Sequence, residues 1–95
     1  MAQGELLIGI DCGTQGLRSV VVDTGGRVLG EASQEYPIAY PRPAWAEQNP
    51  DDWWAAARAT VAAALAASGA SPGDIAGLSV DGTSCTVVAC RRDGT

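Results

Sequence analysis

Residues 7–23, LIGIDCGTQGLRSVVVD, decide the fold, because two apolar runs flank a short polar turn that contains two glycines. Residues 5–11 and residues 17–23 each have the length and the β-branched composition of a strand. The turn between them is too short to hold a helix, so we expect the strands to pair as an antiparallel hairpin. The run of three valines in the second strand is expected to be the best buried.

The following segments extend this hairpin into a meander. TGG at residues 24–26 offers glycine for a tight connection, and the more polar residues 27–35 indicate a third strand. Residues 36–50 contain four of the five prolines in the chain. Because proline removes a backbone donor and restricts the residue before it, this segment is expected to be an extended surface loop.

An alanine-rich helix is predicted for residues 50–68. Asn49 is suited to the N-cap, Pro50 to the first turn, and Gly69 to the end of the helix. The apolar spacing predicts that one side of the helix packs on the sheet. The residues expected on that side are Trp53, Trp54, Ala57, Val61 and Leu65.

Beyond the helix, a linker turn at residues 70–74 leads to a strand at residues 75–81 and a further strand at residues 86–90. Between these strands lies a second polar turn, GTSC. The whole pattern predicts an α/β protein with a three-strand antiparallel meander, then a helix and further strands. The acid that ends residues 75–81 precedes a Gly-Thr pair, as Asp11 precedes Gly13 and Thr14.

Composition narrows the function classes. The 95 residues carry a net charge of −5, with six Arg, no Lys and no His. Nucleic-acid and anionic-membrane surfaces need clustered cations, so neither partner is expected. A Walker-type phosphate loop requires lysine and is therefore excluded. The three cysteines form no CxxC pair; we expect buried, reduced side chains and a cytoplasmic protein.

The turn from Asp11 to Gly16 is the strongest chemical signal. A glycine-rich turn can direct backbone N–H groups at phosphate oxygens, and Gly13 allows close approach because it has no Cβ. Thr14 adds a hydroxyl donor, and Asp11 at the strand end could hold Mg²⁺. The spacing of this turn alone favours an ordinary hairpin turn whose acid caps the backbone.

Four ordered segments widen the evidence: IDCGTQGLRSVVVD, GGRVLGEASQEYP, PAWAEQNPDDWW and IAGLSVDGTS. Together they resemble the FGGY carbohydrate kinases over residues 6–94. The resemblance implies the N-terminal part of domain I of such a kinase, a ribonuclease H-like half of the actin-like ATPase fold, here incomplete. It also implies MgATP as cofactor and transfer of the ATP γ-phosphate to a hydroxyl of a ketopentose or polyol.

Residue by residue, the resemblance implies that Asp11 holds Mg²⁺ near the β- and γ-phosphates. It matches Gly13, Thr14 and Gln15 to the first phosphate loop of the family. Arg18 falls where relatives often carry a cation beyond the loop, so it is a candidate nucleotide contact; its alternative is a solvated cation on the strand.

The second turn is a candidate substrate site. Asp81, Thr83 and Ser84 could bind sugar hydroxyls, since paired donors and acceptors suit vicinal diols. The DGTSC string looks more like the ribulokinase branch than like relatives with larger side chains there. The alternative is a plain polar β-turn.

The flanking aromatic and polar residues are expected to be structural. Sugar stacking by Trp45, Trp53 and Trp54 is not favoured, and Trp53 and Trp54 are predicted to pack the loop and helix onto the sheet. Glu47 and Gln48 are predicted to cap the helix or brace the loop.

The same resemblance implies what lies outside these 95 residues. The catalytic base and the adenosine site are expected farther along, in a C-terminal kinase domain, so this piece is expected to be inactive alone. Two alternatives remain: a non-catalytic module or gene remnant with the same half-fold, and another member of the actin-like ATPase superfamily. The residues do not name the sugar, and they leave a homo-oligomer open.

Overall fold

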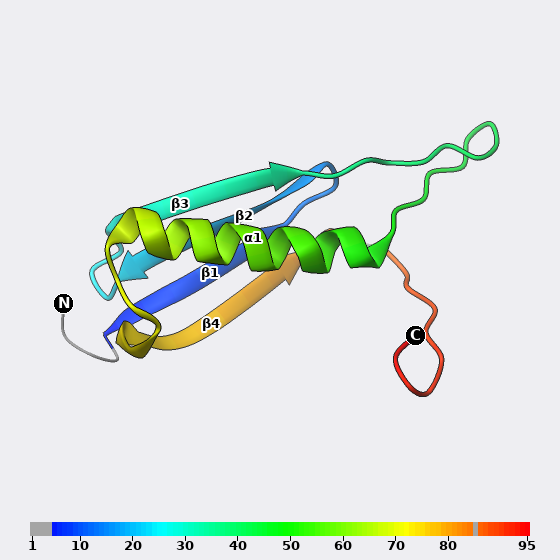
Figure 1. Ribbon diagram of the computed structural model, residues 1–95. Coiled ribbons are helices and arrows are strands. Elements are labelled where there is room, and N and C mark those ends of the chain that lie inside the picture. Colours follow the sequence, from blue (N-terminus) through cyan, green and yellow to red (C-terminus); the bar gives the residue numbers. More distant parts are fainter. Residues whose placement is uncertain (1–4, 85) are drawn as a thin grey trace.

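Four strands form one mixed sheet with a single long helix on one of its faces (Figure 1). The computed structural model describes residues 5–84 and 86–95. The elements in chain order are β1 (Leu6–Cys12), β2 (Gly16–Asp23), β3 (Val28–Glu35), α1 (Pro50–Ser68), a 3₁₀ turn at Pro72–Asp74 and β4 (Ile75–Gly82). The predicted meander, helix and following strand are therefore confirmed.

The sheet order is β3-β2-β1-β4, with β1 and β4 parallel and the other neighbours antiparallel. Parallel pairing requires a crossover connection, which the loop after β3 and helix α1 provide. Leu6, Ile8 and Ile10 alternate along β1 toward the helix and are buried. In β2, Val21 is fully buried and its two valine neighbours are half-buried, which confirms the middle of that run as core.

Helix α1 begins and ends at the predicted residues. The Asn49 side chain accepts a hydrogen bond from the Asp51 N–H at 3.0 Å, and Pro50 occupies the first turn. At the other end, Gly69 adopts a left-handed conformation with φ of 76°, which glycine tolerates best. The ends of the helix are thus set by local capping residues.

The buried side of α1 differs from the prediction. Its centre is the row Ala56, Thr60 and Ala64, whereas Trp54 is 66% exposed. The other predicted residues, Trp53, Ala57, Val61 and Leu65, are half-buried and pack beside this row. The reason is the close approach of the helix to β3 at Gly30, where a Cβ would lie 2.4 Å from the Ala64 carbonyl oxygen. Only small side chains fit in such a contact.

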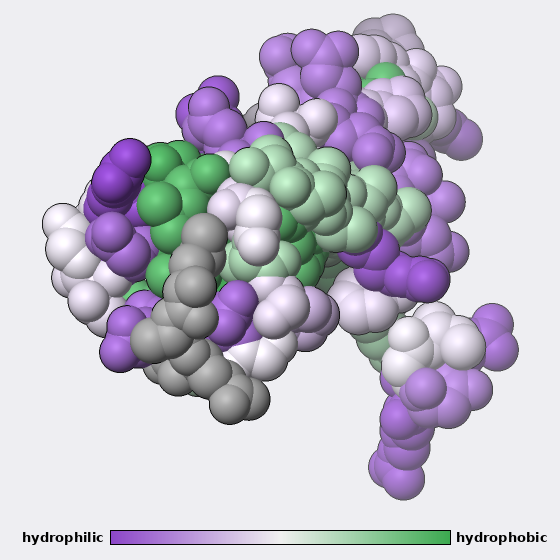
Figure 2. Space-filling model, turned by 60° about the vertical axis from the view of Figure 1, so that its left-hand side comes forward, coloured by the Kyte–Doolittle hydropathy of each residue, from purple (hydrophilic) through white to green (hydrophobic). Residues whose placement is uncertain are grey.

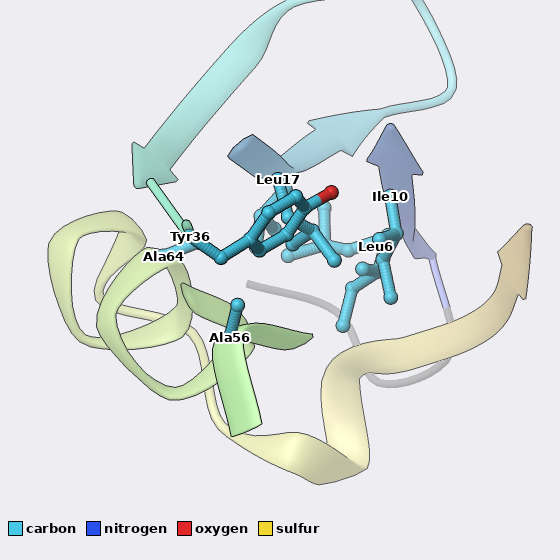
Figure 3. Packing of buried hydrophobic residues seen from close by; sticks show 8 residues of the cluster. Leu6, Ile10, Leu17, Tyr36, Ala56 and Ala64 are labelled. Atoms are coloured by element: carbon cyan, nitrogen blue, oxygen red, sulfur yellow. The ribbon is translucent and has the colours of Figure 1, made fainter. Parts of the chain in front are cut away.

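One buried polar pair joins the helix to the sheet. The Thr60 hydroxyl donates to the Ala56 carbonyl at 2.8 Å and accepts from the Ser19 hydroxyl, also at 2.8 Å. Both side chains are almost completely buried. Because each hydroxyl has a partner, the pair is compatible with the apolar core around it, which Figure 3 shows from close by.

Helix α1 covers β2 and β3 but leaves β4 largely bare (Figure 1). Leu78 and Val80 on β4 are 54% and 59% exposed. Figure 2 shows hydrophobic residues gathered in the middle of one face of the molecule, with hydrophilic residues around them. No helix in the part of the chain described here is long and apolar enough to cross a membrane.

The predicted strand at residues 86–90 is absent from the described residues. This segment leads away from the sheet (Figure 1), and Val87 is 89% exposed. Its β-branched composition favours a strand only where a neighbouring strand is available for pairing. The expectation for the cysteines is also wrong in part, since Cys12 is half-buried and Cys90 is exposed, while Cys85 lies outside the described residues.

Candidate functional site

The turn between β1 and β2 is tight, and its two glycines are required by space. The Gly13 N–H donates to the Gly16 carbonyl at 2.9 Å and closes the turn. A Cβ on Gly13 would lie 3.0 Å from that oxygen, and a Cβ on Gly16 would lie 2.9 Å from the Gln34 carbonyl oxygen. Glycine is needed here because backbone approaches backbone.

Donors from residues 36–48 hold the carbonyls of this turn. The Tyr36 hydroxyl donates to the Gly13 carbonyl and lies 3.1 Å from the Gly16 carbonyl, and the Tyr36 N–H donates to the Gln15 carbonyl at 3.1 Å. The Gln48 amide donates to the Thr14 carbonyl. Among the described residues, by contrast, the N–H groups of Thr14 and Gln15 have no acceptor. The turn therefore presents two free donors.

Tyr36 is the residue that sequence reasoning missed. Its role depends on the end of β3 lying beside the first turn, and the only signal in the chain is an aromatic residue at the start of the proline-rich loop. Burial, followed by the hydrogen bond with the Cys12 thiol, raises the pKa of Tyr36. Its hydroxyl therefore stays protonated and remains a donor.

The second turn lies beside the first because β1 and β4 run parallel. Asp11 and Asp81 are partners in the register, and so are Cys12 and Gly82. The Thr14 and Thr83 hydroxyls are 3.4 Å apart, and the Thr83 hydroxyl is 3.4 Å from the Cys12 carbonyl. Two turns that are about seventy residues apart in sequence thus form one site.

Asp11 affects the second acid of the site. The hydrogen bond that the protonated Asp81 carboxyl donates to Asp11, followed by the negative charge of Asp11, raises the pKa of the exposed Asp81. In the part of the chain that the structure describes, no cluster of three or more acidic, His or Cys side chains could hold a metal ion. Mg²⁺ commonly takes only one or two protein carboxylates, with water and phosphate oxygens completing its shell. The donor set around Asp11 fits such a site.

The remaining predicted residues lie around these turns. Arg18 is exposed and faces Asp11 across the β1–β2 ladder, so both side chains leave the sheet on the face away from α1. Gln15 is exposed at the tip of the first turn, and Ser84 is exposed just after Thr83. All eight predicted positions are thus found at one end of the sheet.

A cavity of about 730 Å³ opens next to the two turns. Its walls come from the first turn, the loop after β3, the start of α1 and the segment after β4, including Thr14, Gln48, Trp53 and Thr83. Neither Asp81 nor Ser84 lines it. The cavity is large enough for a small-molecule ligand.

The polar residues before α1 brace the turn. The Trp53 indole N–H donates to the Gln48 side-chain oxygen at 2.8 Å, which turns the Gln48 amide toward Thr14. The expectation that Gln48 braces the loop is confirmed, whereas Glu47 pairs through its backbone with Ala39. Trp45 is 52% exposed and packs against Arg42, whose guanidinium lies 5.1 Å from the ring centroid.

The antiparallel meander, the crossover helix and the parallel strand β4 define an α/β protein. Comparison with known families identifies the group: residues 6–94 match the N-terminal domain of the FGGY family of carbohydrate kinases. The chain belongs to this family.

Curated relatives agree with this assignment. The glycerol kinase of Delftia acidovorans is 40% identical over 86 residues, which cover 90% of this chain and 17% of the relative. That of Paracidovorax citrulli is 38% identical over 86 residues, with the same coverage. The chain therefore spans about a sixth of the length of these relatives.

Solved structures show the same relationship. The xylulose kinase of Rhodospirillum rubrum superimposes with a TM-score of 0.86 and 30% identity, over 95% of this chain and 18% of that one. Gluconate kinase from Lactobacillus acidophilus, at 22% identity and a TM-score of 0.81, supports the fold alone. The predicted actin-like ATPase fold class, represented here by its first part, is confirmed. The likeness to the ribulokinase branch stays a prediction.

Proposed function

We propose that this chain supplies one side of the nucleotide and sugar sites of an ATP-dependent carbohydrate kinase. The observation that carries the proposal is the first turn, whose carbonyls are held by protein donors while the Thr14 and Gln15 N–H groups have no acceptor among residues 5–84 and 86–95. Free backbone N–H groups in a tight turn bind anions such as phosphate. The turn would hold the β- and γ-phosphates of ATP.

The residues of the first turn have distinct roles in this proposal. Gly13 keeps the turn narrow, Thr14 and Gln15 donate their N–H groups, and the Thr14 hydroxyl adds a further donor. Arg18 contributes positive charge on the same face of the sheet as Asp11. Asp11 would hold Mg²⁺, which would supply positive charge next to the phosphates.

The sugar or polyol occupies the second turn and the adjoining cavity. Thr83 lines the cavity and lies next to Thr14. Asp81 and Ser84 lie outside the cavity lining and would contribute from the second turn itself. Relatives named glycerol kinase and xylulose kinase support a polyol or ketopentose as the phosphate acceptor. Thr14 and Thr83 would then face the two reactants at the point where they meet.

The chemistry expected of these residues is positioning and charge stabilisation. Phosphoryl transfer also needs a group that takes the proton of the sugar hydroxyl. We assign no such base to this chain, because Asp11 is committed to the metal and the family resemblance places the base farther along. The kinase activity is therefore proposed for the protein translated from the full reading frame.

A coupled ADP-release assay on that protein, with glycerol, xylulose and ribulose as acceptors, tests the proposal. Asp11→Ala should lower kcat by about 10²–10³-fold, as removal of a preorganised charge at a transition state does. Thr14→Ala should lower kcat/KM by about tenfold or more, because it removes a hydrogen bond to a charged group.

Two exposed residues provide matched controls, Thr24→Ala in the β2–β3 connection and Asp93→Ala near the end of the chain. Both should retain wild-type activity. Full activity in the Asp11 and Thr14 variants would refute the phosphate-site assignment. A wild-type protein that releases no ADP with any acceptor would instead favour a non-catalytic module.

A further inference from the structure

The contacts that hold the first turn come from a short stretch of chain. The Tyr36 hydroxyl donates to the Gly13 carbonyl and lies 3.1 Å from the Gly16 carbonyl, and the Tyr36 N–H donates to the Gln15 carbonyl. The Gln48 amide donates to the Thr14 carbonyl. Each carbonyl from residue 13 to residue 15 therefore has a donor from the loop that follows β3, and the Gly16 carbonyl accepts from the Gly13 N–H.

These contacts fix the direction of the free N–H groups. All described peptide bonds are trans, so a carbonyl and the N–H of the next residue point in opposite directions. Holding the Gly13 carbonyl toward Tyr36 thus directs the Thr14 N–H away from Tyr36. In the same way, holding the Thr14 carbonyl toward Gln48 directs the Gln15 N–H away from Gln48.

Both donors are themselves fixed. The Tyr36 ring is 7% exposed and packs in the core beside Leu17 and Ile10, as Figure 3 shows. The orientation of the Gln48 amide is set by the Trp53 indole N–H, which donates to the oxygen of that amide at 2.8 Å. The core and the start of α1 therefore determine where the two donors lie.

We propose that Tyr36 and Gln48 are positioning residues that aim the Thr14 and Gln15 N–H groups at the β- and γ-phosphates of the nucleotide. This inference rests on the proposed function. Neither residue touches the phosphates; each acts through a carbonyl of the turn. Preorganised donors bind charge more strongly because little reorganisation is needed when the ligand arrives.

Tyr36→Phe tests the first contact, because it keeps the buried ring and removes only the hydroxyl. Nucleotide affinity is measured by calorimetry on the full-reading-frame protein, with MgATP and with AMP, which lacks the β- and γ-phosphates. We expect the Kd for MgATP to rise about two- to tenfold, the effect of one lost hydrogen bond, and the Kd for AMP to stay unchanged. Tyr40→Phe, at a side chain that is 71% exposed, is the matched control.

Gln48→Met tests the second contact at a half-buried position, where misfolding is a smaller risk. It keeps the length of the side chain, removes the donor and adds no charge; Gln34→Met on exposed β3 is its control. The same selective loss of MgATP affinity is expected.

Three results separate the possible failures. If Tyr36→Phe and Gln48→Met bind MgATP as their controls do, or lose affinity for AMP as much as for MgATP, the positioning role is overturned although the kinase function stands. If the two variants lose affinity for MgATP but not for AMP, while the wild-type protein phosphorylates no sugar, the proposed function fails and the positioning role stands. If the wild-type protein binds no MgATP, both are overturned.

Discussion

Substitution of Gly30 by alanine should separate helix α1 from β3. The added Cβ would lie 2.4 Å from the Ala64 carbonyl oxygen, 2.6 Å from the Ser68 nitrogen and 3.0 Å from the Ser68 Cα. All three are backbone atoms of the helix, so no side-chain rotation relieves the overlap. The helix must move by about 1 Å to restore ordinary contact distances, which begin near 3.5 Å.

Overpacking of this kind lowers the free energy of unfolding by about 1–3 kcal/mol. For a domain of 60–100 residues, each kcal/mol lowers Tm by about 4–8 °C, so we expect Tm to fall by about 4–24 °C. Thermal unfolding followed by circular dichroism measures it. Gly77→Ala is the matched control, since a Cβ there meets only the Leu7 side chain, at 3.7 Å. Equal Tm values for the two variants would show that α1 does not rest on β3 at this point.

Two other predictions concern polar groups. Thr60→Val leaves the buried Ser19 hydroxyl without its partner and should lower the free energy of unfolding by about 1–3 kcal/mol. Urea unfolding should show that the double variant with Ser19→Ala loses less stability than the sum of the two single losses. A double variant that loses the full sum would contradict the pairing. The pKa of Asp81 is raised in the folded state above its ordinary value of 3.8, so the folded state binds the carboxyl proton more tightly than the unfolded state does. The stability that protonated Asp81 contributes is therefore lost as pH rises from 3.8 through the raised pKa of the folded state. Asp81→Asn should therefore raise Tm at neutral pH and leave it unchanged below pH 3.8, and a pH-independent difference would exclude repulsion by Asp11 as the cause.

Local signals in the sequence were sufficient for the elements that depend on neighbouring residues. The helix begins after Asn49 and ends before Gly69, as predicted, because capping is decided within one turn of chain. The meander was predictable for a similar reason, because a short turn that contains glycine places the two strands it joins next to each other.

Contacts between distant segments were not predictable in the same way. In an alanine-rich helix, the row Ala56, Thr60, Ala64 and the row through Trp53 and Ala57 are both plausible core faces. Gly30 on β3 decides between them, because the close approach it permits excludes large side chains. The strand expected at residues 86–90 failed for a related reason: β-branched composition does not supply the neighbouring strand that pairing requires.

The candidate site shows both sides of this limit. Asp11 and Thr14 were recognisable from the turn itself, but Tyr36 was not, because nothing near it in sequence indicates that the end of β3 lies against that turn. Gln48 is an intermediate case: a bracing role was expected, yet the carbonyl it holds became clear only in three dimensions.

The parallel register of β1 and β4 brings together the acid and the threonine that both turns contain. Because Asp11 and Asp81 are register partners, the two acids lie at the same level of the sheet and the two threonines lie beside each other. Two carboxylates in such proximity repel each other, as the raised pKa of Asp81 indicates. A divalent cation at Asp11 would reduce that repulsion, since its charge is opposite and larger than that of the neighbouring carboxylate. Under the proposed function, this arrangement would let the metal arrive together with the nucleotide phosphates and would leave the neighbouring turn for a hydroxyl-bearing acceptor.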